Sequence, residues 1–144
     1  MYNHPLGLNL YNLNNSKEQI NKIKKAIVFE GEKSCLLYQS YFGKDNDISV
    51  ACCGSAVSAW QMNTLIELGA TEIIIAFDKQ FKQRNDEEFK HLTKNLTAIY
   101  NKYKNDVNIS FIFDKEGNML GYKDSPIDRG MDIFIKMFKN RVII

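Results

Sequence analysis

Two short hydrophobic runs in this chain each lead directly to an acidic residue. Residues 26–29 (AIVF) are followed by Glu30, and residues 73–77 (IIIAF) are followed by Asp78. Short runs rich in β-branched residues are typical of strands that are buried on both faces of a parallel sheet. Parallel sheets bind their ligands at the edge where the strands end, so Glu30 and Asp78 are predicted to lie at one functional site.

Two carboxylates at the same edge of a sheet repel each other. The repulsion is relieved if one acid is protonated or if a cation lies between them. Carboxylate oxygens are the ligands that hard divalent cations prefer. We therefore expect a site for Mg²⁺, or for Mn²⁺ in its place, at the ends of these two strands.

The spacing of apolar residues elsewhere predicts further strands with helices between them. Four strands are expected, at residues 26–29, 48–52, 72–77 and 107–113. Helical patterns are found over residues 16–23, 33–41, 57–68, 88–103 and 131–138. The expected fold class is therefore α/β, with about four mainly parallel strands flanked by helices.

Residues with capping roles mark the ends of several of these helices. Gly69 is placed to end the helix over 57–68 in a left-handed conformation. Asn85 with Glu88 can form a capping box at the start of the next helix, and Ser125 followed by Pro126 predicts the start of the last one.

A length of 144 residues suits one compact domain. We expect residues 1–25 to form an N-terminal arm and a short helix, and residues 26–144 to form the core. No apolar run approaches the length of a membrane span, and the N-terminus lacks the pattern of a secretory signal. A cytoplasmic protein without membrane contact is expected.

Neither the cysteines nor the net charge indicate a particular function. The three cysteines show no Cys-x-x-Cys spacing, so neither a zinc site nor a disulfide framework is indicated. The net charge of +2 is too small to predict nucleic-acid binding by itself. One local basic cluster stands out because it follows Asp78 at a strand end, where a phosphate would bind: Lys79, Lys82 and Arg84.

Several motifs resemble those of a known family. Residues 26–34 (AIVFEGEKS) and 73–78 (IIIAFD) look like the two signature motifs of Toprim domains. Residues 53–56 (CGSA) fall where bacterial and phage primases carry a Gly-Thr or Gly-Ser loop, and residues 123–128 (KDSPID) resemble their later acidic segment. The chain thus resembles the Toprim domain of the bacterial and phage DNA primase (DnaG-like) type. Its first motif is closest to primase-like proteins of phages and mobile elements.

The resemblance implies a fold of parallel strands flanked by helices, with metal ions at the strand ends, and a role for each acid. Glu30 matches the family glutamate, which coordinates metal or acts as general acid or base in phosphoryl transfer. Asp78 matches the first aspartate of the Asp-x-Asp motif and would ligate Mg²⁺ directly, while Asp124 would complete the cluster. Gln80 and Asp128 are the remaining candidate ligands.

Two positions depart from the family pattern. Ser34 stands where the family often has an acid four residues after its glutamate, and Gln80 replaces the second acid of Asp-x-Asp. Fewer negative charges weaken metal binding, and a glutamine carbonyl supplies an oxygen without a charge. The candidate contacts to nucleic acid or nucleotide are Lys33, Gly54, Ser55, Lys79, Lys82 and Arg84.

Each acid also has a purely structural interpretation. Glu30 could cap the helix that follows it, and Asp78 could start a turn. Asp128 is placed to close a capping box with Ser125, and it therefore ranks below Asp124 as a metal ligand. Asp124 could itself be a solvated residue of a turn.

The residues and the resemblance leave three functions open. The first is Mg²⁺-dependent nucleotidyl transfer, which makes RNA primers on a DNA template from nucleoside triphosphates in DNA replication. The chain would then be the catalytic part of a larger protein, with a replicative helicase as a further partner. The second function is that of a Toprim nuclease, which would cleave nucleic acid. The third is a degenerate, non-catalytic module that binds nucleic acid or a protein partner, which Ser34 and Gln80 favour.

Overall fold

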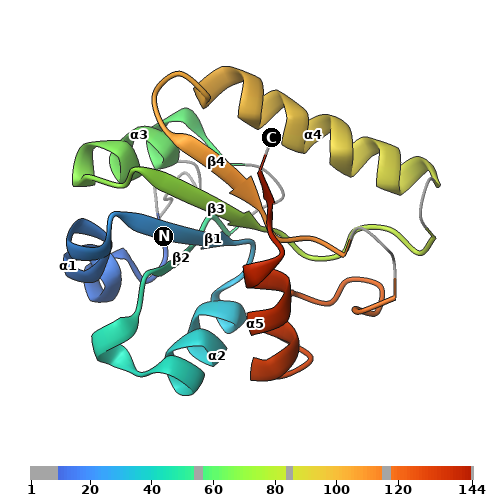
Figure 1. The fold of residues 1–144 in the computed structure, drawn as a ribbon, viewed down its shortest axis with the longest axis horizontal. Helices are drawn as coiled ribbons and strands as arrows, with labels where there is room; N and C mark the ends of the chain where they lie inside the picture. The colour runs from blue at the N-terminus through green and yellow to red at the C-terminus, as the bar shows by residue number, and fades with distance from the viewer. Residues whose placement is uncertain (1–9, 54–56, 84–85, 115–117, 144) are drawn as a thin grey trace, which may run out of the picture.

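The computed structural model describes residues 10–53, 57–83, 86–114 and 118–143, and its secondary structure alternates between helices and strands (Figure 1). In chain order the elements are α1 (Leu13–Ile23), β1 (Lys25–Phe29), α2 (Glu32–Phe42), the short 3₁₀ helix η2 (Lys44–Asn46), β2 (Ser49–Ala51), α3 (Ala59–Leu68), β3 (Glu72–Ala76), α4 (Glu87–Tyr103), β4 (Asn108–Phe111), α5 (Met131–Lys139) and β5 (Val142–Ile143).

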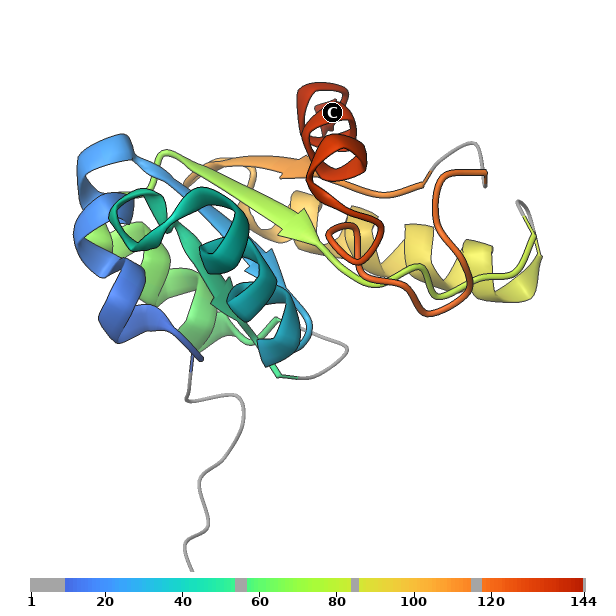
Figure 2. The same cartoon turned by 90° about the horizontal axis from the view of Figure 1, so that it is seen from below.

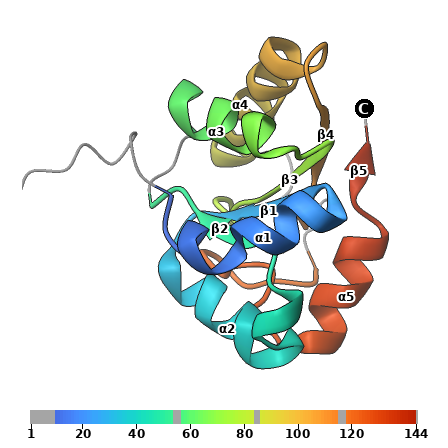
Figure 3. The same cartoon turned by 90° about the vertical axis from the view of Figure 1, so that its left-hand side faces the viewer.

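The strands form one sheet in the order β2-β1-β3-β4-β5. The first four are parallel, and β5 is antiparallel to β4. Helices α3 and α4 cover one face of the sheet, and α2 and α5 cover the other (Figure 3). The predicted α/β class with four parallel strands and flanking helices is confirmed, and β5 is an addition.

The core is centred on β1 and β3, the two strands with helices on both faces. Ile27, Val28, Ile73 and Ile74 have no exposed surface. Burial on both faces explains why these strands are continuous apolar runs instead of alternating patterns. Each fully buried isoleucine contributes roughly 1.5–3 kcal/mol, so the strands that carry Glu30 and Asp78 are firmly held.

One predicted helix end is confirmed, the left-handed cap at Gly69, and the structure adds capping contacts that the sequence analysis did not predict. Ser58 and Gln61 form a capping box at the start of α3, and Gly69 ends that helix with φ +112°. The start of α4 is capped by the side chain of Asp86, which accepts a hydrogen bond from the Phe89 amide. Asn85, the residue predicted to cap α4, lies outside the described residues.

Two helix starts differ from the prediction. The first helix begins at Leu13, three residues before Ser16, because the chain turns at Asn12 with φ +72° and the Ser16 hydroxyl donates back to the Asn12 carbonyl. The predicted Ser125 start closes a turn instead, with hydrogen bonds in both directions between Ser125 and Asp128. The last helix begins only after Gly130, whose φ is +101°.

No helix within the described ranges is long and apolar enough to cross a membrane.

Candidate active site at the carboxyl edge of the sheet

The ends of β1 and β3 lie at the point where the strand order changes direction. From β1 the chain passes through α2 to β2 on one side, and then through α3 to β3 on the other side. Helices that leave in opposite directions open a crevice outside the strand ends, which is where parallel sheets bind ligands. Glu30 follows β1 directly, and Asp78 lies two residues beyond β3.

A pair of hydrogen bonds joins the ends of these two strands. The backbone N–H of Asp78 donates to Oε1 of Glu30 over 3.1 Å. The side-chain amide of Gln80 donates to the same oxygen. The two acids predicted to meet are therefore brought together, and Gln80 holds the Glu30 carboxylate in place.

The electrostatics of the site make it hard to ionise every acid. Burial is the main cause that raises the pKa of Asp78, and the negative charges of Glu30, Asp128 and Asp124 add to it in that order; together they bring this pKa to about 7. Burial also raises the pKa of Glu30, although the hydrogen bonds from Gln80 and from the Asp78 backbone oppose the shift. Near neutral pH the site therefore needs a proton or a cation to balance its charge.

The later acidic segment lies beside the end of β3. The Lys79 N–H donates to the Asp124 carbonyl over 2.8 Å, and the Lys123 N–H donates to the Lys79 carbonyl over 2.7 Å. Figure 2 shows the chain after β3 running next to the segment that precedes α5. Asp124 is therefore hydrogen-bonded through its backbone to Lys79, the residue that follows Asp78.

Ser34 connects the same segment to the start of α2. Its hydroxyl donates to the hydroxyl of Ser125 over 2.7 Å, and both side chains are buried. A buried hydroxyl pair of this kind needs no charge to balance it. The position at which the resembling family often has an acid therefore has a structural contact here.

The two aspartates of this segment differ in how their oxygens are used. Oδ2 of Asp124 accepts from Arg129 Nε over 2.6 Å and from the Gly121 N–H over 2.7 Å, and these two hydrogen bonds lower the pKa of that carboxyl. Asp128 accepts from the Ser125 N–H through one oxygen. Its other oxygen, Oδ1, is buried and has no partner among the described residues. The buried oxygen without a described partner is thus on Asp128, whereas both hydrogen bonds that Asp124 accepts use Oδ2.

The acids do not form a closed cage of ligands. Within the described part of the chain, no three His, Cys, Asp or Glu side chains are grouped so as to hold a metal ion. Mg²⁺ is commonly held by one or two carboxylates, with water and substrate phosphates as its other ligands. The arrangement fits an open site of that kind better than a dedicated cage.

The residues predicted to contact nucleic acid or nucleotide are placed very differently from one another. Lys79 is buried: its ammonium lies 3.1 Å from Asp114 Oδ2 and donates to the Leu120 carbonyl over 2.8 Å. Its charge is therefore used inside the protein, contrary to the expected phosphate contact. Lys33 and Lys82 are exposed. The other three candidates lie outside the described residues: Gly54, Ser55 and Arg84.

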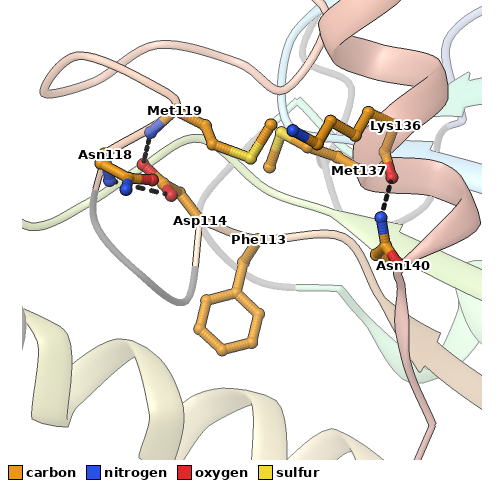
Figure 4. A pocket seen from close by; sticks show the side chains of 7 residues that line it. All are labelled: Phe113, Asp114, Asn118, Met119, Lys136, Met137 and Asn140. Atoms are coloured by element: carbon orange, nitrogen blue, oxygen red, sulfur yellow. Dashed lines mark hydrogen bonds between the residues drawn. The ribbon is translucent and has the colours of Figure 1, made fainter.

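Two hollows lie near these residues, and the sequence predicted neither. One, of about 240 Å³, is lined by Gln80 and by Glu87, Glu88 and His91 from the start of α4. The second, of about 370 Å³, lies beyond the end of β4 (Figure 4), where Met119, Met137 and Lys136 point toward one another; Phe113, Asp114, Asn118 and Asn140 complete its lining. Arg129 was also missed, because an arginine five residues after an aspartate in a turn follows no periodic pattern.

No protein-family model matches the chain. A relative in sequence is the SPbeta prophage-derived uncharacterized protein YorJ of Bacillus subtilis strain 168, which is 32% identical over 151 residues. The match covers 100% of this chain and 39% of that protein.

The structure is similar to that of the Aquifex aeolicus primase (zinc-binding and RNA polymerase domains), with a TM-score of 0.68 and 20% identity over 98% of this chain. It is also similar to a DnaG primase catalytic domain bound to single-stranded DNA, with a TM-score of 0.65 and 17% identity over 97% of this chain. The chain has the fold of DnaG primase catalytic domains. This chain spans 32% of the first structure and 41% of the second.

Proposed function

We propose that this chain is a Toprim-type catalytic domain of a DNA primase-like protein, which uses a divalent metal to transfer nucleotides during RNA primer synthesis on a DNA template. One observation carries the proposal. Glu30 and Asp78 come from distant parts of the sequence and are joined by a hydrogen bond at the switch point of a primase-like fold. The resemblance of both motifs to the Toprim signature supports the same assignment.

The residues of the site suit a hard divalent cation. The raised pKa of Asp78 reflects burial and unrelieved negative charge, and no described residue donates a hydrogen bond to its carboxylate. Asp128 adds a buried oxygen without a partner among the described residues. Asp78 and Asp128 would hold Mg²⁺ or Mn²⁺, with Gln80 and Asp124 next to them. When bound, the metal would neutralise charge on the reacting phosphates.

Glu30 is placed to donate or accept a proton. Its raised pKa means that the carboxyl group takes up a proton more readily than an ordinary glutamate does. The hydrogen bonds from Gln80 and from the Asp78 backbone fix the orientation of the group. A fixed carboxyl with a pKa moved toward neutrality is suited to act as general acid or base in nucleotidyl transfer.

The comparisons bear on the partners of this activity. One structure with the same fold is bound to single-stranded DNA, which supports a DNA template as partner of this chain. The relative in a prophage supports a role in replication of a phage or mobile element. Because the chain spans only part of each, the complete reaction, with nucleoside triphosphates and a helicase contact, would belong to a larger protein.

A non-catalytic binding module is the second candidate. It is favoured by the amide of Gln80, which occupies an oxygen of Glu30, and by Arg129, which already balances the charge of Asp124. Such a module would bind nucleic acid without turnover. A nuclease would instead cleave the template.

Primer synthesis by the full-length protein separates these functions. The assay uses a single-stranded DNA template, nucleoside triphosphates and Mg²⁺ or Mn²⁺. We expect Glu30→Gln and Asp78→Asn each to lower the rate by roughly 100-fold or more, and Lys104→Ala, at an exposed position after α4, to leave it unchanged. Equal rates in the wild type and both acid variants would refute the proposal, and template cleavage would point to a nuclease.

A further inference from the structure

Tyr122 is a large aromatic side chain left 40% exposed next to the candidate site. The ammonium of Lys82 lies 5.2 Å from the centre of its ring, and that of Lys123 lies 5.6 Å away. An exposed ring with two cations at this distance offers both a stacking surface and sites for phosphate.

The backbone fixes this ring beside the carboxylates. Lys123 is paired through its N–H with the carbonyl of Lys79, which immediately follows Asp78. Lys123 also has φ +67°, a left-handed backbone conformation that residues other than glycine rarely adopt. The paired segments bring Lys82, from the chain after β3, to the ring of Tyr122.

The phenol end of the ring is tethered on the other side. Its hydroxyl donates to Glu88 over 2.8 Å, and this bond together with the nearby charges of Glu88 and Asp86 raises the pKa of Tyr122. Glu88 also lines the hollow that reaches Gln80. The two acids at the phenol end repel phosphate, so an approaching strand would place its phosphates on the lysines.

We propose that Tyr122 stacks on one unpaired base of a single-stranded nucleic acid, with Lys82 and Lys123 contacting the neighbouring phosphates. The proposal rests on the proposed function, because the bound strand is the one that would be presented to Glu30 and Asp78. A single strand is required, since only an unpaired base can offer its face to the ring. A DNA template and an RNA primer share this chemistry.

We call Tyr122, Lys82 and Lys123 together the platform. Oligonucleotide binding without divalent metal tests it independently of catalysis. Fluorescence anisotropy of the full-length protein with labelled dT and rU oligomers of about 12 nucleotides would compare the wild type with Tyr122→Ala and Tyr122→Phe. Stacking predicts a roughly 5- to 150-fold loss for Tyr122→Ala and at most about a twofold change for Tyr122→Phe, which keeps the ring. A larger loss for dT than for rU would assign the platform to DNA, and the reverse would assign it to RNA.

The chain offers a matched control on α4. Tyr100 also has a lysine near its ring, Lys104 at 5.8 Å, but it lies toward the other end of that helix from Glu88. Tyr100→Ala should leave oligonucleotide binding unchanged. An equal loss in Tyr100→Ala and Tyr122→Ala would show a general effect on folding and overturn the platform.

The lysines are tested by the salt dependence of binding. Each phosphate contact removed should lower the slope of log K against log salt by about 0.7. Lys82→Ala and Lys123→Ala should each show this change, and Lys104→Ala should not.

Two further outcomes would overturn the platform: a Tyr122→Ala variant that binds as tightly as the wild type, or a wild type that binds neither oligomer. If binding is unchanged in Tyr122→Ala while Asp78→Asn still abolishes primer synthesis, the platform fails and the proposed function stands. If Tyr122→Ala weakens binding but Glu30→Gln and Asp78→Asn keep full synthesis, the proposed function fails and the platform stands as a binding site.

Discussion

The backbone N–H of Asp78 donates a hydrogen bond to the carboxylate of Glu30, 48 positions earlier in the sequence. This bond joins the ends of the two central strands and places both acids at the switch point of the sheet. Asp78 carries the more unusual electrostatics, because burial and three neighbouring carboxylates raise its pKa to about 7.

Asp78→Asn should change how stability depends on pH. The pKa of Asp78, about 7 when folded, exceeds its ordinary value of 3.8. The folded protein therefore holds a proton that the unfolded chain loses, and stability falls as pH rises between these values. Without metal at pH 8, Asp78→Asn should be more stable than the wild type by about 1–2 kcal/mol, after allowing for solvent screening.

Urea unfolding in the presence of a chelator, at pH 4 and pH 8, measures this difference. The variant and the wild type should differ least at pH 4. Asp45→Asn, at an exposed position in η2, serves as control and should follow the wild type at both values. A wild type and an Asp78→Asn variant with parallel pH profiles would contradict the assigned pKa.

Binding of Mg²⁺ should release a proton from Asp78. At pH 6.5 much of the Asp78 population is protonated, because its pKa is about 7. Metal binding must displace that proton, so calorimetry in buffers of different ionisation enthalpy should detect about 0.5–1 proton released at pH 6.5 and almost none at pH 8.5. Asp78→Asn should lose both the heat and the proton release. A metal-dependent heat that is the same in this variant would place the metal elsewhere.

Gln80→Asp should strengthen metal binding and lower the stability of the metal-free fold. The substitution removes the hydrogen bond from Gln80 to Glu30 and adds a fourth negative charge near Asp78. We expect Mg²⁺ affinity to rise by about tenfold, since a charged oxygen replaces a neutral one. Gln80→Glu is a useful second variant of the same charge. Weaker Mg²⁺ binding in both would argue against metal at this position.

Lys79→Ala should destabilise the fold more than it affects nucleic-acid binding. The ammonium of Lys79 is paired with Asp114, and both side chains are buried. Removing it leaves an uncompensated charge on Asp114, which costs about 3–5 kcal/mol in such settings. Urea unfolding would measure this, with Lys82→Ala as the exposed control at about 0.5 kcal/mol or less. Equal stability of the two variants would contradict the buried pair.

The sequence was most informative where one local pattern decides the structure. The apolar runs of β1 and β3 predict buried parallel strands, and Gly69 ends α3 in the left-handed conformation that its position predicts. The helix that apolar spacing predicts up to residue 103 is equally local: Leu92, Leu96 and Tyr103 are the buried residues of α4.

The remaining features depend on contacts between distant segments. Strand β5 has only two residues and is defined by its pairing with β4. Lys79 reads as a surface cation in sequence, and only the fold reveals Asp114 beneath it. In both cases a contact with a distant segment decides the structure. The predicted helix start at Ser125 fails for a local reason instead, because the turn closed by Asp128 forms there.

The central claim is that Glu30 and Asp78 act as one catalytic unit, and a double-mutant cycle on primer synthesis tests it most directly. The full-length wild type, Glu30→Gln, Asp78→Asn and the double variant are assayed on one single-stranded template with Mn²⁺ and Mg²⁺. Residues that work as a unit lose nearly everything with the first substitution. We predict that the double variant is no slower than the slower single variant. Full synthesis in either single variant, or losses that multiply in the double variant, would contradict the claim.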